Sequence, residues 1–191
     1  MDLRIVSGHP ALDLANTVAP RQPGDRVEFL PDPAALLAWA PRPGIVTEAE
    51  AERIEQAWAG DPDAAGRALT DVLELRTLVD LTLTGQGLDR LGRRWAAAIG
   101  RSALVPAEPG VTLLVGTAPA TMIGDRLADA LVDLLRTADL SRLRTCPIDE
   151  GGCGFYFLDA SRNLSRRWCS MEDCGAQAKS RRLTERRRAR R

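Results

Sequence analysis

The four cysteines constrain this chain more than any other feature. All of them lie between Cys146 and Cys174 of a 191-residue sequence, and they form two pairs. Six residues separate Cys146 from Cys153, and four separate Cys169 from Cys174. At structural sites zinc binds four thiolates in tetrahedral geometry, and short loops bring each pair of sulfur atoms together. The spacing therefore predicts a structural zinc site formed by all four cysteines.

Two other arrangements would also use these cysteines: two disulfides, or four unrelated core residues. The second arrangement is disfavoured because all four cysteines lie within one short stretch of the sequence. The N-terminal sequence lacks the long apolar core and cleavage pattern of a signal peptide. No apolar run reaches the ~18 residues that a membrane span needs. We therefore expect a cytoplasmic protein with no membrane partner, and reduced thiols there favour metal over disulfides.

The charges of the chain are divided unevenly along its length. The sequence is neutral overall, with 26 basic and 26 acidic residues. Residues 141–191 hold 13 of the basic and 6 of the acidic ones, a net charge of +7, which leaves −7 on residues 1–140. An acidic body followed by a basic segment indicates that the basic segment meets a polyanion.

The basic residues nearest the cysteines are the first candidates for nucleic-acid contacts. Residues 176–188 have helix-favouring composition, and a helix there would place Lys179, Arg182 and Arg186 on one face. Such a stripe can lie along phosphates or reach base edges in a major groove. The alternative for residues 187–191 is a solvated tail. The basic residues predicted to contact nucleic acid are Arg162, Arg166, Arg167, Lys179, Arg181, Arg182 and Arg186.

Capping patterns and helical spacing of apolar residues predict helices before the cysteines. Asp32 and Pro33 are typical of a helix start, and Thr47–Glu50 has the form of a capping box. Asp61 followed by proline opens a third helix that reaches Gly85. The remaining predicted elements are a weak strand at 3–6, a helix spanning Leu88–Ile99, a strand pair within 101–117 and a helix at 122–140.

These elements predict the fold class α+β with two parts. Residues 1–140 form a mainly helical domain with a small strand pair, for sensing or dimerisation. Residues 141–191 form a small zinc module with a loop between the first cysteines, a strand at Phe155–Leu158 and a basic C-terminal helix. That order resembles a treble clef. Trp168 and Met171 are expected to pack around the metal, and Asp159 and Ser161 to cap a turn.

The same residues resemble a known family. Phe157–Asn163, Ser165–Met171, Cys174-Gly175 and Lys179 closely resemble the CGNR zinc finger. Leu12–Val18 is similar to the opening motif of the ABATE domain, which precedes that finger. The resemblance implies a bacterial, stress-related transcription regulator with zinc on four cysteines and a DNA-binding finger.

The sequence departs from the family pattern in two places. The motif Cys-Gly-Asn-Arg is here Cys174-Gly175-Ala176-Gln177, and the first cysteine pair is wider than usual. If the family arginine contacts DNA, Gln177 keeps a hydrogen bond to a base but not the charge. Gln177 therefore joins the predicted nucleic-acid-binding residues. Zinc binding is expected to be unaffected.

Other function classes remain open from the sequence. An arginine-rich zinc module also suits RNA or a ribosome, and a small enzyme with structural zinc is a third hypothesis. His9, Asp13 and Asn16 cluster near the N-terminus, but no catalytic set is recognisable, so we expect no enzyme. Asp13 and Asn16 are expected to fix backbone turns or caps. A small-molecule effector at the N-terminal domain and a homodimer are expected by analogy with other regulators, and no residue identifies the effector.

Overall fold

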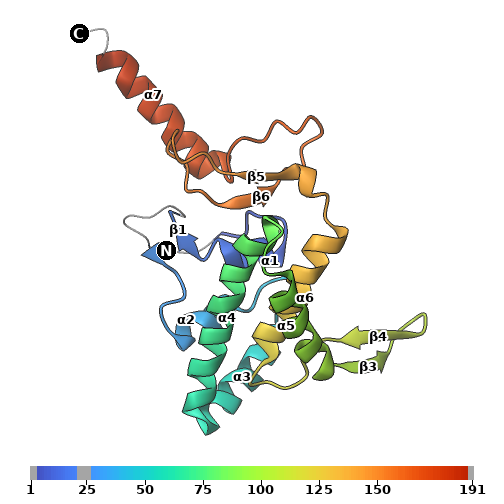
Figure 1. Cartoon of the computed structure of the whole chain (residues 1–191). Coiled ribbons are helices and arrows are strands. Elements are labelled where there is room, and N and C mark those ends of the chain that lie inside the picture. Colours follow the sequence, from blue (N-terminus) through green and yellow to red (C-terminus); the bar gives the residue numbers. More distant parts are fainter. Residues whose placement is uncertain (1–3, 21–26, 189–191) are drawn as a thin grey trace. The chain divides into compact units, whose positions relative to one another are not determined.

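A computed structural model describes residues 4–20 and 27–188 (Figure 1). The chain divides into two compact units. The helical unit is Phe29–Ala138, and the cysteine unit combines the described residues up to Glu28 with those from Asp139 onwards. The chain passes from one unit to the other twice, at Glu28–Phe29 and at Ala138–Asp139. The boundary predicted after residue 140 lies close to the second of these positions. The first crossing, at Glu28–Phe29, was not predicted.

The helical unit contains the helices that the capping patterns and the spacing of apolar residues predict. They are α2 (Pro33–Trp39), α3 (Glu48–Gly60), α4 (Pro62–Leu83), α5 (Leu88–Gly100) and α6 (Met122–Thr137). Asp32 caps α2 through its carboxylate, which accepts from the Ala35 amide at 2.7 Å. Thr47 and Glu50 form both halves of the capping box before α3. Apolar residues of these helices make the core, among them Leu36, Ile54, Val72, Leu127 and Leu131.

The predicted strand pair is confirmed as an antiparallel hairpin. Strands β3 (Ala103–Pro106) and β4 (Val111–Leu114) pair over their full length, with Ala103 opposite Leu114 and Pro106 opposite Val111. The hairpin projects from the end of α5 (Figure 1). Leu104 and Val111 are 71% and 67% exposed, because no other described part of this unit covers that face.

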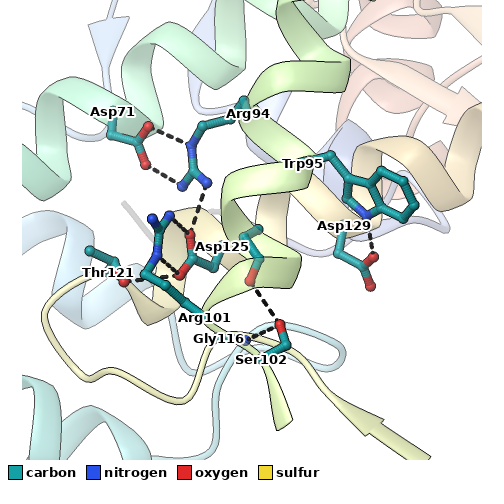
Figure 2. A network of polar contacts seen from close by, with 10 residues as sticks. Asp71, Arg94, Trp95, Arg101, Ser102, Gly116, Thr121, Asp125 and Asp129 are labelled. Atoms are coloured by element: carbon teal, nitrogen blue, oxygen red, sulfur yellow. Dashed lines mark hydrogen bonds and ion pairs between the residues drawn. The ribbon is translucent and has the colours of Figure 1, made fainter. Parts of the chain in front are cut away.

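A buried ion-pair network joins three helices of this unit, and no sequence pattern predicted it (Figure 2). Asp125 of α6 is fully buried. Arg94 of α5 donates to Asp125 at 2.8 Å and pairs with both oxygens of Asp71 of α4 at 2.8 and 2.7 Å. Arg101 donates to Asp125 at 2.8 and 2.5 Å. Burial opposes ionisation of Asp125, but the hydrogen bonds from Arg101 and Arg94 prevail and lower its pKa.

A second ion pair joins α6 to α3. Arg126 donates to both carboxylate oxygens of Glu50 at 2.6 Å each and to the carbonyl oxygens of Ile45 and Val115 at 2.8 and 3.0 Å. The hydrogen bonds from Arg126 lower the pKa of Glu50 to about 2. Glu50 thus completes the capping box of α3 and ties that helix to α6.

The cysteine unit begins with a short helix and ends with a long one. Its elements are α1 (Pro10–Ala15), the strand pair β1 (Val18–Ala19) and β2 (Val27–Glu28), a 3₁₀ turn at Leu140–Arg142, the strand pair β5 (Leu143–Thr145) and β6 (Tyr156–Leu158), a π-helical turn at Met171–Gly175, and α7 (Ala176–Arg188). Strands β5 and β6 are antiparallel, with Leu143 opposite Leu158.

These observations confirm the predicted fold class, α+β and mainly helical, with small strand pairs and a cysteine module that leads into the C-terminal helix. The strand predicted at 3–6 is wrong over residues 4–6, which are irregular, and Leu3 lies outside the described residues. Within the described ranges, no helix is long and apolar enough to cross a membrane.

Candidate metal centre and nucleic-acid interface

The four cysteine thiols converge on one point. One ligand atom from each of Cys146, Cys153, Cys169 and Cys174 lies within 4.8 Å of all the others. The sulfur of Cys169 lies 3.3 Å from that of Cys153 and 3.7 Å from that of Cys174. Zinc–sulfur bonds of ~2.3 Å in a tetrahedron place the sulfur atoms ~3.8 Å apart. A disulfide requires ~2.05 Å, and all four thiols are free. The cluster therefore fits a structural zinc ion.

Backbone hydrogen bonds hold the first cysteine pair in a closed loop. The Cys146 amide donates to the Phe155 carbonyl at 2.9 Å, and the Gly154 amide donates to the Cys146 carbonyl at 3.2 Å. The second pair depends on the turn before α7, where the Ser170 hydroxyl accepts from the Asp173 amide at 3.2 Å. Cys174 lies in that turn, so α7 starts directly from the cluster.

The chemistry of the thiols also favours a cation. Side-chain hydrogen bonds with Cys153 and Cys169 lower the pKa of Cys146. The same hydrogen bond to Cys146 raises the pKa of Cys169. Several thiolates in so small a space repel one another, and a bound Zn²⁺ offsets that repulsion because it coordinates thiolates rather than thiols.

A small apolar core surrounds the thiols. Phe157 is fully buried, and Trp168 and Ala178 are 6% and 4% exposed and pack against the cysteines. Packing around the cluster is thus confirmed for Trp168. The same prediction is wrong for Met171, which is 67% exposed. Because this core is small, the unit depends on a further source of stability, which a metal site supplies.

Asn16 joins the N-terminal segment to this module. Its side-chain amide donates to the Tyr156 carbonyl at 2.8 Å, and its oxygen accepts from the Tyr156 amide at 2.8 Å. Asn16 thereby pairs with strand β6 as a neighbouring strand would. The Leu158 amide also donates to the Ser7 carbonyl at 2.8 Å. Asn16 was predicted to fix a turn or cap, but its side chain instead binds the backbone of a strand 140 positions away in the sequence.

The other N-terminal polar residues also have structural positions. The Nδ1 atom of His9 accepts from the Ala11 amide at 3.2 Å and caps α1. Asp13 is buried in the first turn of α1. Asp159 behaves as predicted, since its carboxylate accepts from the Ser161 amide at 2.8 Å and from the Arg166 amide at 3.0 Å. The hydrogen bonds from Ser161 lower the pKa of Asp159.

Arg166 points into the unit. Its guanidinium donates to the carbonyl oxygens of Trp168 at 3.1 Å and Val6 at 3.0 Å, and also to that of Cys169. It lies over the Phe157 ring, with its central carbon 4.5 Å from the ring centroid. Arg166 therefore links the loop before Cys169 to the N-terminal segment. No surface pattern in the sequence distinguished it from the neighbouring arginines.

Three other predicted residues gather around one acidic residue. The Glu150 carboxylate accepts from Arg182 at 2.5 Å and from Arg167, and the Glu150 carbonyl accepts from Arg181 at 2.5 Å. The hydrogen bond from Arg167 is the main cause of a lowered pKa at Glu150. From the sequence, this loop was predicted only to form a turn.

The remaining predicted residues are exposed. Arg162, Gln177, Lys179 and Arg186 have no partner among the residues that the structure describes. Lys179, Arg182 and Arg186 line a hollow of about 280 Å³ beside Trp168 and Leu183. The structure thus places the predicted helix face along one concave surface. Its contact with nucleic acid stays a prediction.

Gly152 provides a test of how tightly the first loop is packed against the cluster. A Cβ atom on Gly152 would lie 2.5 Å from the Cys146 sulfur and 2.7 Å from the Pro147 carbonyl oxygen. We expect Gly152→Ala to destabilise the loop by about 1–3 kcal/mol and to release zinc at a lower chelator concentration than wild type. Gly92→Ala, where nothing lies within 4 Å, is the matched control. Equal zinc release from both variants would contradict this account.

Comparisons with known proteins agree with the site. A family model described as "CGNR zinc finger" matches residues 142–187. A second, ABATE, described as "Putative stress-induced transcription regulator", matches residues 8–138, well over half of the chain. No individually curated protein matches the sequence. The chain therefore belongs to the ABATE family, and its ABATE region is followed by a CGNR zinc finger.

Proposed function

We propose that this protein is a zinc-dependent transcription regulator that binds duplex DNA with its cysteine unit. The matched families are of regulatory and zinc-finger type, and a four-cysteine site is present. The observation that carries the proposal is the exposed basic face of α7, which starts at the metal cluster. The proposed activity is binding, not catalysis.

Helix α7 has the charge and length for this role. It spans 13 residues, so it is ~20 Å long, and it carries six basic residues against one acidic residue, Glu185. Lys179, Arg182 and Arg186 lie three and four residues apart on one face and line the same hollow. Such a helix can follow a phosphate backbone or enter a major groove about 12 Å wide.

The proposed contacts divide by chemistry. Exposed charge for phosphates comes from Arg162, Arg167, Lys179, Arg181, Arg182 and Arg186. Gln177, in the first turn of α7, is exposed and presents an amide that can pair with adenine. Arg166 supports the fold of the unit instead, because its donors are used by backbone carbonyls. The acidic helical unit takes the sensing or dimerising role in this proposal.

The experiment is titration of the zinc-loaded full chain into fluorescent random duplex DNA at several salt concentrations. We expect binding whose log affinity falls by about 0.9 per contacted phosphate for each unit of log salt. Lys179→Ala should reduce that slope by about one contact. Arg93→Ala, an exposed arginine on α5, should leave the slope unchanged.

Competition with RNA and selection of bound sequences complete the test. Absence of DNA binding at low salt by the zinc-loaded chain would overturn the proposal. Displacement of the DNA by equimolar single-stranded or duplex RNA would support the RNA-binding alternative. Enrichment of a DNA motif would establish sequence-specific regulation, and binding without a motif would reduce the proposal to non-specific contact.

A further inference from the structure

The loop between the first two cysteines carries an acidic residue onto the basic surface. Glu150 lies in this six-residue loop. Its two carboxylate oxygens are shared between Arg182 of α7 and Arg167 of the segment before Cys169. Its backbone carbonyl accepts from Arg181 at 2.5 Å. Three of the residues assigned to nucleic-acid contact therefore meet at one loop residue.

The loop is shaped to receive these arginines. Two short hydrogen bonds close it, from the Gly151 amide to Ile148 and from the Gly152 amide to Pro147, each at 2.7 Å. Gly151 has φ +86°, which favours glycine, and a Cβ there would lie 0.8 Å from a guanidinium nitrogen of Arg181. The guanidinium occupies the space that a side chain at this position would need.

These ion pairs are exchangeable. The side chains of Arg167 and Arg182 are 53% and 54% exposed, and that of Glu150 is 26% exposed. Exposed pairs of this kind add little net stability, because water and salt screen them. A carboxylate and a phosphate offer guanidinium groups the same pair of acceptor oxygens. Glu150 therefore presents to Arg167 and Arg182 the chemistry that a DNA phosphate would present.

We propose that Glu150 acts as an internal substitute for a nucleic-acid phosphate, and that duplex DNA displaces it when the finger binds. This inference rests on the proposed function. Its consequence is discrimination: DNA that engages Arg167 and Arg182 must first replace the carboxylate, so weak non-specific contacts are penalised. Release of Glu150 also frees the Arg182 guanidinium to bind a phosphate beside the hollow that Arg182 lines with Lys179 and Arg186.

The test compares Glu150→Gln with Asp149→Asn in the zinc-loaded full chain. Both changes remove one negative charge from the same loop, but Asp149 is exposed, and the described ion pairs of Arg167 and Arg182 are with Glu150. We expect Glu150→Gln to tighten binding to random duplex DNA about tenfold, because two ion pairs are each worth a few-fold. Asp149→Asn should change the affinity by less than about threefold.

A third variant separates contact from charge. Glu150→Asp keeps the charge but shortens the side chain by one methylene, so it should also tighten binding, though less than Glu150→Gln. One zinc per chain in every variant confirms that the loop still folds. Equal affinities for Glu150→Gln and Asp149→Asn would overturn the inference. Weaker binding by Glu150→Gln than by wild type would also overturn it, because Glu150 would then orient the arginines.

The two proposals fail in different ways. If the wild-type chain binds no DNA, the proposed function fails, and the inference fails with it. If the wild type binds DNA and Glu150→Gln behaves as Asp149→Asn does, only the role of Glu150 is wrong.

Discussion

Replacing Cys169 by serine is expected to unfold the zinc module and abolish DNA binding. The sulfur of Cys169 lies 3.3 Å from that of Cys153 and 3.7 Å from that of Cys174, so it is an integral part of the cluster. Zinc contributes about 10–16 kcal/mol of apparent binding free energy to modules of this size. The small core around Phe157 and Trp168 cannot replace that contribution.

Zinc content and local unfolding are the measurements. Wild-type chain should hold one zinc ion, and Cys169→Ser well below one. Protease should then cut the variant between residues 141 and 188, while the helical unit keeps its circular dichroism signal. Chelator added to wild type should reproduce the same pattern. A Cys169→Ser chain that retains one zinc ion and wild-type protease resistance would show that the cluster does not depend on this thiol.

The features that could be predicted from the sequence are local ones. Asp32 and Thr47 accept hydrogen bonds from amides three residues away, so these helix caps can be recognised from a short stretch of sequence alone. The periodicity of α6 and the strand–turn–strand pattern at 101–117 are equally local. The metal centre could be predicted because only cysteine offers thiolates, and all four cysteines lie close together in the sequence.

The features that could not be predicted depend on distant pairing. Asp125 of α6 meets Arg94 and Arg101 only after α5 and α6 pack together, and nothing in its own neighbourhood in the sequence marks it as buried. Arg166 and Arg167 are adjacent and chemically identical, yet one bonds to buried carbonyls and the other pairs with Glu150. Which way an arginine points depends on the backbone direction of a loop, and composition does not determine that direction.

The position of the N-terminal motif has a consequence for the family architecture. The ABATE match begins at residue 8, but Ser7 and Asn16 bond to the finger strand β6. Arg4 also pairs with Glu172 at 3.0 Å and with Asp173 at 3.1 Å, in the turn that carries Cys174. The zinc module is therefore completed by residues from the opposite end of the chain, and a fragment starting at residue 141 lacks them.

Asn16→Ala is accordingly expected to weaken the zinc module although it touches no cysteine. The substitution removes both hydrogen bonds between the Asn16 side chain and the Tyr156 backbone. Asn16 is 2% exposed, so water does not readily replace its amide. Each lost hydrogen bond to a buried group costs about 1–3 kcal/mol, which gives a loss of about 2–6 kcal/mol for the pair.

Hydrogen exchange and zinc release can locate that loss. In Asn16→Ala the Tyr156 amide should exchange faster by at least about tenfold, and zinc should pass to a chelator at lower concentration than in wild type. Asn163→Ala, an exposed asparagine in the same unit, is the matched control and should change neither. If Asn16→Ala loses stability only in the helical unit, with zinc release unchanged, the N-terminal segment does not support the finger. If both signals move together, the ABATE motif is part of the structure that holds the metal.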